Sequence, residues 1–305
     1  MIEAWRSLAK IFGARLVFQA PLRDFTSFRV GGPAKVFAKP EDAGELQAVL
    51  AAARSENLPI IVLGGGSNIL FDDAGFNGLV IKLGSAFAGL RGDGPIVWAG
   101  AAAAGADLLA RSLASNLGGL EGLAGLPGTV GGAVAGNAGA GPEGLGRSVT
   151  RIFILDETGR NRTIEAEDLH FAYRSLSGLP ERAVILEVEF ALTPTSPEEV
   201  RARLKEFRER RRLQPRGGRS AGCVFKNPST FSAGRLIDEC GFKGQRIGGA
   251  WVSESHANFI LAEDGATAAD ILALIERIRE GVSARHGLAL ELELKVFGPG
   301  GEERG

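Results

Sequence analysis

The sequence predicts an α+β protein, because segments typical of helices and of strands are both abundant along the chain. Apolar residues recur with the spacing of an amphipathic helix in four segments: 41–59, 105–118, 197–214 and 267–287. Short apolar runs bounded by turn residues indicate strands at 60–63, 78–83, 95–100, 149–155 and 183–192. The closing segment, 288–298, alternates apolar with acidic residues, which is the pattern of a strand with one solvated face.

Local signals define several ends of these elements. Ser196 and Pro197 together are a helix start signal, and we expect Gly118 to stop the second helix. The acidic stretch DETG, 156–159, predicts a short turn between the last two of the internal strands. The basic run RERRRLQPR, 208–216, follows acidic residues in the third helix, so we interpret it as a solvated helix end and not as a nucleic-acid patch.

The length and polarity of the apolar segments change at about residue 196. The larger N-terminal part holds most of the long apolar segments, whereas those of the smaller C-terminal part are shorter and more polar. The closing strand could return from this second part of the chain to the first part.

Composition limits the class of protein. The chain has 305 residues, of which 45% are apolar, and a formal net charge of −1. This balance offers no general attraction to nucleic acid or to an anionic membrane. Two cysteines, Cys223 and Cys240, indicate a reducing compartment and not a disulfide framework. Because there is also no signal peptide and no stretch long enough to span a membrane, we expect a cytoplasmic protein.

Three consecutive glycines interrupt the apolar run in VLGGGSNILF, residues 62–71. Glycines of this kind let backbone N–H groups approach a phosphate closely. The stretch is not a Rossmann fingerprint, since Ile69 stands where a glycine is required, and the Gly-Lys-Ser/Thr of a P-loop is absent. A phosphate here would be held in another way.

A second glycine-rich stretch, GLAGLPGTVGGAVAGNAGAG, covers 122–141, and we expect it to lack regular structure. Apolar residues such as Leu123, Val130 and Val134 are interleaved with the glycines, whereas flexible linkers are rich in glycine and polar residues. The stretch is therefore predicted to pack closely against its surroundings. Two such loops suit an elongated ligand that has a pyrophosphate and a flat ring, such as a flavin or a nucleobase.

Seven motifs occur in a characteristic order: TSFRVGGPA (26–34), LGGGSNIL (63–70), GLPGTVGGAVAGNAGA (125–140), YRSLS (173–177), GCVFKNP (222–228), LIDECGFKGQRIGGAWVSESHANFI (236–260) and LELELKVFG (290–298). From about residue 20 to 298 the chain thereby resembles the UDP-N-acetylenolpyruvoylglucosamine reductases, the MurB family of peptidoglycan synthesis. The short interval from Tyr173 to Cys223 is similar to the second subtype of that family, which lacks an inserted loop over the substrate. One departure is Gly141, where the family tends to have a tyrosine.

The resemblance implies a fold. It is the vanillyl-alcohol-oxidase-type FAD-binding fold of two α+β subdomains, 1–82 (completed by the strand 290–298) and 83–196, followed by an α+β substrate-binding domain, 197–289. Residues of the two glycine loops would contact the FAD: Gly64, Gly65, Gly66, Ser67, Asn68, Gly128, Thr129, Gly132 and Ala133. The three histidines, His170, His256 and His286, all lie outside these loops, so we expect the FAD to be bound non-covalently.

The resemblance also implies an activity. NADPH would reduce the FAD, and the flavin would pass hydride to the enolpyruvyl ether of UDP-N-acetylglucosamine-enolpyruvate, giving UDP-N-acetylmuramate. Arg174 would stabilise the developing enolate, and Cys223 would deliver the final proton. Glu291 would act beside the enolate in one of two roles: as a protonated acid, which burial would favour, or as a carboxylate that bridges to a cation. Four further residues match positions on the substrate side: Tyr173, Asn227, Lys243 and His256.

Two other functions stay open at this point. One is an FAD-dependent alcohol or hydroxy-acid oxidase on the same fold, which an alcohol would reduce directly and NADPH would not. The other is a non-catalytic UDP-sugar-binding protein, which would stay colourless when FAD is added. The sequence indicates no obligate protein partner, and no nucleic acid or membrane partner.

Overall fold

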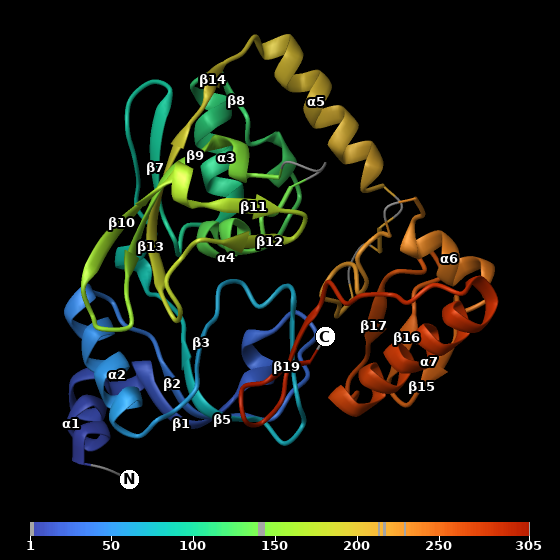
Figure 1. Cartoon of the computed structure of the whole chain (residues 1–305), viewed down its shortest axis with the longest axis horizontal. Coiled ribbons are helices and arrows are strands. Elements are labelled where there is room, and N and C mark those ends of the chain that lie inside the picture. Colours follow the sequence, from blue (N-terminus) through green and yellow to red (C-terminus); the bar gives the residue numbers. More distant parts are fainter. Residues whose placement is uncertain (1–2, 140–143, 213, 216–217, 229, 305) are drawn as a thin grey trace. The chain divides into compact units, whose positions relative to one another are not determined.

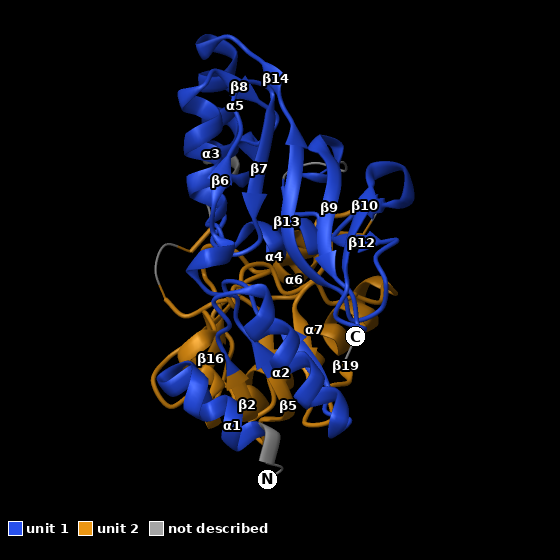
Figure 2. Cartoon of the chain, turned by 90° about the vertical axis from the view of Figure 1, so that its left-hand side faces the viewer, with its two compact units in different colours: residues 1–17, 38–65, 80–212 blue, residues 18–37, 66–79, 213–305 orange. Residues whose placement is uncertain are grey.

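The computed structural model describes residues 3–139, 144–212, 214–215, 218–228 and 230–304. The chain forms two compact units, each built from separate stretches of sequence (Figure 2). Unit 1 comprises Met1–Val17, Ala38–Gly65 and Val80–Arg212, and unit 2 comprises Phe18–Phe37, Gly66–Leu79 and Leu213–Gly305. In the described part of the chain, no helix is long and apolar enough to cross a membrane.

A five-stranded antiparallel sheet forms the centre of unit 1 (Figure 1). Its order is β10-β9-β13-β7-β6, and the strands are β6 (Leu90–Arg91), β7 (Ile96–Gly100), β9 (Val149–Leu155), β10 (Asn161–Glu165) and β13 (Val184–Ala191). Ile152, Ile154, Val188 and Phe190 on the two central strands are fully buried. Helix α4 (Val130–Ala135) packs against β7 and β13, and α3 (Gly105–Ala114) packs against α4.

The acidic turn leads to a strand that we did not predict. Residues 156–160 connect β9 to β10, and two further strands, β11 (His170–Ala172) and β12 (Ser175–Ser177), come before β13. One carboxylate oxygen of Asp156 accepts hydrogen bonds from the backbone N–H groups of Thr158 and Arg160 at 2.9 and 3.0 Å. These bonds stabilise a tight turn, after which β10 runs antiparallel to β9. Strand β10 was not predicted because Ile164 is its only buried residue, and a single apolar residue does not give the alternating pattern of a strand.

The second glycine-rich stretch also differs from the expectation, because it contains a helix. Helix α4 begins after Thr129, whose side chain accepts a hydrogen bond from the backbone N–H of Gly132. Val130 and Val134, four residues apart, are both buried and hold one face of the helix against the sheet. Packing of this face outweighs the poor helix propensity of glycine.

The predicted end of α3 is also wrong. The helix ends at Ala114, and Gly118 belongs to a short strand, β8 (Leu117–Gly118), which pairs with β14 (Thr193–Pro194). Asn116 takes the left-handed conformation that we expected of a glycine, with a φ of 53°. Helix α5 (Pro197–Arg210) begins as predicted, with Ser196 as its N-cap and Pro197 in its first turn.

A four-stranded sheet is formed by strands that lie between residues 16 and 81. Its order is β1-β2-β5-β3, and the strands are β1 (Leu16–Pro21), β2 (Pro33–Ala38), β3 (Ile60–Val62) and β5 (Phe76–Ile81). Helix α1 (Glu3–Phe12) is in contact with α2 (Ala43–Ser55). Asp42 is the N-cap of α2, and its carboxylate accepts a hydrogen bond from the Glu45 N–H at 2.8 Å. The predicted helix 41–59 and the strands 60–63 and 78–83 correspond to α2, β3 and β5.

Unit 2 contains two small sheets, one of which is packed against a helix. One sheet has the order β15-β16-β17, with β15 (Arg246–Ile247), β16 (Ala250–Val252) and β17 (Ile260–Ala262). Helix α7 (Ala268–His286) begins with a capping box of Thr267 and Asp270 and ends at Gly287, as its pattern predicted. It packs against β15, β16 and α6 (Ala233–Glu239) through buried residues at helical spacing: Ile271, Leu274, Ile275, Ile278 and Val282.

The closing segment returns to pair with a strand from the N-terminal part of the sequence. Within 288–298, the only strand is β18 (Lys295–Phe297), which runs parallel to β4 (Ile69–Phe71) and antiparallel to β19 (Glu303–Arg304). The register places Val296 opposite Leu70, and both side chains are fully buried. All three residues of β4 are buried, as is typical of a strand with a parallel neighbour.

Candidate active site

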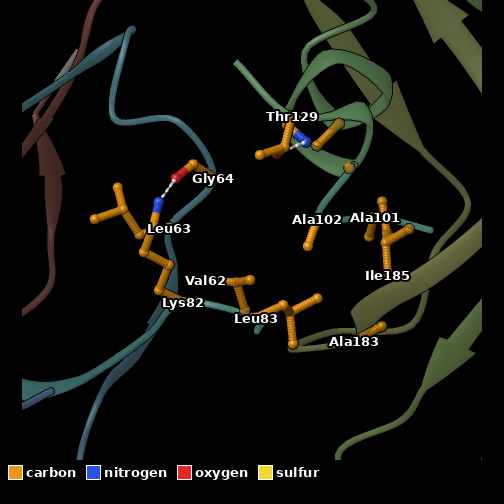
Figure 3. A pocket seen from close by; sticks show the side chains of 13 residues that line it. Val62, Leu63, Gly64, Lys82, Leu83, Ala101, Ala102, Thr129, Ala183 and Ile185 are labelled. Atoms are coloured by element: carbon orange, nitrogen blue, oxygen red, sulfur yellow. Dashed lines mark hydrogen bonds between the residues drawn. The ribbon is translucent and has the colours of Figure 1, made fainter. Parts of the chain in front are cut away.

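A cavity of about 180 Å³ lies within unit 1, beside the ends of β3, β5 and β7 and the start of β13 (Figure 3). Helix α4 supplies another wall. Small residues make up much of the lining: Ala101, Ala102, Gly131, Gly132, Ala135 and Ala183. Val62, Leu83 and Ile185 add larger apolar surface. Small and apolar walls of this kind leave room for a flat ring.

The two glycine loops approach each other at this cavity. A Cβ atom on Gly64 would lie 2.6 Å from the hydroxyl oxygen of Thr129, and one on Gly65 would lie 2.7 Å from Gly128 Cα. Both distances are too short for any side chain. The first loop therefore requires glycine at 64 and 65 because its backbone passes directly against the second loop.

Helix α4 is held to the segment after β7 in the same close manner. The backbone N–H groups of Val130 and Gly131 donate to the carbonyls of Ala103 and Ala101 at 2.8 and 2.9 Å. A Cβ atom on Gly131 would lie 2.9 Å from the Cβ of Ala101. The wall formed by α4 is thus positioned by backbone contacts, which small residues permit.

Lys82 contributes the only ammonium group among the described residues that line the cavity, and the sequence analysis did not single it out. Its Nζ donates to the carbonyl oxygen of Gly64 at 2.6 Å. Burial lowers the pKa of Lys82, and the charge of Lys39 lowers it further. The signal that could have found it is a lysine within the apolar run GLVIKL, 78–83, directly opposite the glycine loop.

The predicted cofactor residues are divided between the units. Gly64, Thr129 and Gly132 line the cavity, while Gly65, Gly128 and Ala133 belong to the same loops of unit 1 but are not part of its wall. Gly66, Ser67 and Asn68 belong to unit 2. The residues of unit 1 are brought together by the loop contacts described above.

In unit 2, the rest of the first loop has its own local contacts. Gly66 has a φ of 65°, and its carbonyl accepts from the N–H of Ser27 at 2.9 Å. A Cβ atom on Gly66 would collide with the carbonyl of Phe25. The amide Nδ2 of Asn68 donates to the carbonyl of Glu293 at 3.0 Å, which attaches this loop to the segment before β18.

Tyr173 and Arg174 form the tight turn between β11 and β12. Arg174 has a φ of 57°, a conformation that is uncommon for a residue other than glycine. One guanidinium nitrogen donates to the carbonyl of Gly139 at 3.1 Å, and the guanidinium lies 5.2 Å from the centre of the Tyr173 ring. The turn thus holds a cation at the end of the second glycine loop.

A second arginine, which the sequence analysis did not single out, lies near Arg174. Arg211 Nη2 donates to the carbonyl of Gly122 at 2.9 Å, and its Nη1 is buried without a hydrogen-bond partner among the described residues. Burial lowers the pKa of Arg211, and the charge of Arg174 lowers it further. The basic run had been interpreted as a solvated helix end, which does not describe this half-buried residue.

Cys223 and Glu291 occur in unit 2, on two segments that lie side by side. Cys223 pairs with Phe259 in an isolated β-bridge, and Phe225 pairs in the same way with Leu292. The N–H of Lys226 donates to the carbonyl of Glu291 at 2.9 Å. The segment of the cysteine is therefore fastened directly to the segment of the carboxylate.

The burial that we expected for Glu291 is absent. Its side chain is 77% exposed, and its carboxylate lies 3.3 Å from the Nζ of Lys226. The cause is the alternation of the segment, in which Leu290 and Leu294 are buried and Glu291 points away from the core of unit 2. Of the two roles considered for this residue, a carboxylate that bridges to a cation fits this contact.

The substrate-side residues of unit 2 have different partners. Asn227 Oδ1 accepts from the N–H of Ala233 at the start of α6, at 3.0 Å. Lys243 Nζ lies 2.6 Å from a carboxylate oxygen of Asp238. His256 Nδ1 accepts from the N–H of Asn258 at 3.2 Å, and burial, helped by the charge of Lys243, lowers the pKa of His256.

Comparison with known proteins identifies the family. Residues 34–164 match the model of an FAD binding domain, and residues 214–297 match that of the UDP-N-acetylenolpyruvoylglucosamine reductase C-terminal domain. The chain is 40% identical over 296 residues to the UDP-N-acetylenolpyruvoylglucosamine reductase of Heliobacterium modesticaldum, across 96% of this chain and 94% of that relative. The chain belongs to the UDP-N-acetylenolpyruvoylglucosamine reductase family.

Further relatives of this reductase family agree. The reductase of Moorella thermoacetica is 42% identical over 281 residues, which is 92% of each chain. The crystal structure of the reductase MurB from Thermus caldophilus superimposes with a TM-score of 0.80 at 37% identity, covering 92% of this chain and 97% of that one. The predicted family and the predicted fold class, an FAD-binding domain followed by a reductase C-terminal domain, are confirmed.

Two finer predictions are not decided by these reductase relatives. Membership of the second subtype stays a prediction, as do the exact domain boundaries. Gly141, where the family tends to have a tyrosine, lies outside the described residues.

Proposed function

We propose that this chain is an NADPH-dependent flavoenzyme that reduces the enolpyruvyl ether of UDP-N-acetylglucosamine-enolpyruvate to UDP-N-acetylmuramate in peptidoglycan precursor synthesis. The observation that carries the proposal is identity of about 40% with reductases of this name over nearly the whole chain. The cavity between the two glycine loops supplies the physical support, because its construction suits the cofactor that the reaction needs.

The residues of the cavity fit FAD. Its small and apolar lining can accept a flat isoalloxazine ring, and the bare backbone of Gly64 and Gly65 can approach a pyrophosphate. Lys82 adds a cation beside this backbone. We propose that Gly64 to Asn68 bind the pyrophosphate and that Gly128, Thr129, Gly132 and Ala133 lie along the flavin. No histidine occurs in either loop, so this binding would be non-covalent.

When bound, FAD would accept hydride from NADPH and deliver it to the terminal carbon of the enolpyruvyl group. The reaction also requires a cation for the developing negative charge and a proton donor, and side chains of the protein must supply both. A carboxylate next to a carbon that gains negative charge requires a fixed cation, and a guanidinium can hold it with two hydrogen bonds. We propose Arg174 for this role, because its left-handed turn and its bond to Gly139 restrict where the guanidinium can lie.

The neighbouring carbon, which carries the developing negative charge, must finally receive a proton. We propose that the thiol of Cys223 donates this proton. We also propose that Glu291 acts beside the enolate as a carboxylate that is bridged to the ammonium group of Lys226. A thiol is a stronger acid than the hydroxyl of a serine, which suits this residue to proton donation. Tyr173, Asn227, Lys243 and His256 are proposed to bind the rest of the substrate, with Lys243 directed to its diphosphate.

The proposal is tested by separating the two half-reactions. The purified protein should be yellow, should release its flavin in acid, and should be bleached by NADPH and coloured again by the enolpyruvyl substrate. Arg174→Ala should leave bleaching by NADPH nearly unchanged, whereas recolouring by the substrate should slow by about 100-fold or more. Flavin that stays on the acid-precipitated chain would contradict non-covalent binding. Bleaching by an alcohol in place of NADPH would favour an oxidase.

A further inference from the structure

Asn137 occupies an unusual position at the end of α4. Its side chain is 2% exposed, and its backbone is in the left-handed region with a φ of 39°. Its own N–H donates to the carbonyl of Val134 at 3.0 Å, which closes the helix. An asparagine in this conformation is well tolerated, but an exposed one would serve as well. The burial of the amide therefore needs a separate explanation.

Both ends of the amide are used, and they join two different segments. Nδ2 donates to the carbonyl of Ala172 at 2.9 Å, and Oδ1 accepts from the N–H of Gly146 at 3.0 Å. Ala172 is the last residue of β11, directly before the turn Tyr173–Arg174. Buried polar groups that are fully paired fix a single arrangement of the segments they join. Here the fixed segment is the one that carries the proposed cation.

The same stretch of chain also contacts the guanidinium directly. Gly139, two residues after Asn137, accepts the hydrogen bond from Arg174 at 3.1 Å. Gly146 packs against the ring of Phe171 on β11 so closely that any Cβ at 146 would collide with it. Asn137 thus holds the backbone before Arg174, while Gly139 binds the guanidinium of Arg174 and Gly146 packs against β11.

We propose that Asn137 is a positioning residue, which couples helix α4 at the cavity to the turn that aims Arg174. This inference rests on the proposed function, since it gives Asn137 a role in the half-reaction that builds the enolate. It acts through Arg174 and contacts neither substrate nor flavin. Loss of its amide should therefore affect recolouring by the substrate and spare bleaching by NADPH.

Two substitutions test the proposal. Asn137→Gly removes both side-chain hydrogen bonds and suits the left-handed backbone. Asn137→Asp keeps an acceptor for Gly146 but replaces the donor to Ala172 with an oxygen. We expect each variant, measured per bound flavin, to be bleached within about twofold of the wild-type rate and to be recoloured roughly 10- to 100-fold more slowly, the scale of a small misplacement. If Asn137→Gly does not fold, the isosteric Asn137→Asp carries the test.

A control variant distinguishes positioning from general loss of stability. Ser112→Ala removes another buried hydrogen bond of unit 1, from the hydroxyl to the carbonyl of Leu117 at 2.7 Å. It should show wild-type rates in both half-reactions. In addition, Asn137→Gly should slow recolouring no further when Arg174→Ala is already present, because coupled residues are non-additive.

Three results would overturn the inference. They are wild-type recolouring in both Asn137 variants, equal slowing of the two half-reactions, and losses that multiply in the double variant. A wild-type protein that the enolpyruvyl substrate does not recolour would instead overturn the proposed function, and the inference with it.

Discussion

Replacing Gly65 by alanine tests the contact between the two glycine loops. The φ of Gly65 lies outside the left-handed region, so alanine introduces no backbone strain, and the only obstacle is space. Its Cβ would lie 2.7 Å from Gly128 Cα, whereas two carbon atoms prefer about 3.5 to 4.0 Å. The loops must therefore separate by roughly 1 Å, and both are backbone segments that cannot rotate aside.

The expected size of the effect follows from this displacement. Overpacking of this kind costs about 1 to 3 kcal/mol. If the separation is expressed in cofactor binding, the dissociation constant for FAD rises by roughly 5- to 140-fold. Titration of the flavin-free protein with FAD, followed by flavin fluorescence, measures this constant, and thermal unfolding without FAD reveals any part of the cost that falls on folding.

Gly89→Ala is the matched control. It lies in the same unit, has no positive φ, and has nothing within 4 Å of the added Cβ. We expect wild-type FAD affinity in this variant. If Gly65→Ala also binds FAD with wild-type affinity and unfolds at the wild-type temperature, the close approach of the loops is not required, and the reasoning is refuted.

Three further predictions concern side chains. Lys82→Met keeps the apolar stem but loses the charged hydrogen bond to the first loop, so FAD affinity should fall by about tenfold or more in the same titration; unchanged affinity would exclude this role. Cys223→Ser should keep substantial turnover, whereas Cys223→Ala should lose about 100-fold in recolouring by the substrate and little in bleaching by NADPH; an alanine variant with wild-type turnover would show that the proton has another source. Because burial lowers the pKa of His256 in the folded chain, the unfolded chain binds a proton first as pH falls below about 6.5. The free energy of unfolding should then decrease from that pH down to the folded pKa, and urea titrations of wild type and His256→Asn should differ in this slope; equal slopes would contradict the assignment.

The elements that could be predicted are those whose signals are local. Helix α7 shows this well, since its capping box, its apolar spacing and its terminal Gly287 all lie within one stretch of sequence. Helix α5 likewise begins at the predicted Ser196. The family, too, could be recognised from ordered motifs, and its glycine loops drew attention to the residues that line the cavity.

The elements that were missed depend on contacts with distant parts of the chain. Helix α4 forms in a glycine-rich stretch because Val130 and Val134 are buried against the sheet, and β10 pairs with β9 although only one of its residues is buried. The return of the closing strand was expected, but its exact partner, β4, depends on a distant contact in which Val296 meets Leu70 in the core of unit 2. Propensity and periodicity describe neighbours along the chain, whereas these choices are made by partners across it.

The sequence by itself determined which chemistry the chain carries, because a guanidinium, a thiol and two glycine-rich loops are properties of residues and can be read one motif at a time. Only the tertiary structure decided what surrounds them. It brought Lys82 to the carbonyl of Gly64, left Glu291 exposed beside Lys226, and buried the amide of Asn137 between two segments. The physical reason is that burial and hydrogen-bond geometry arise from residues far apart in sequence, which only folding brings within a few ångströms.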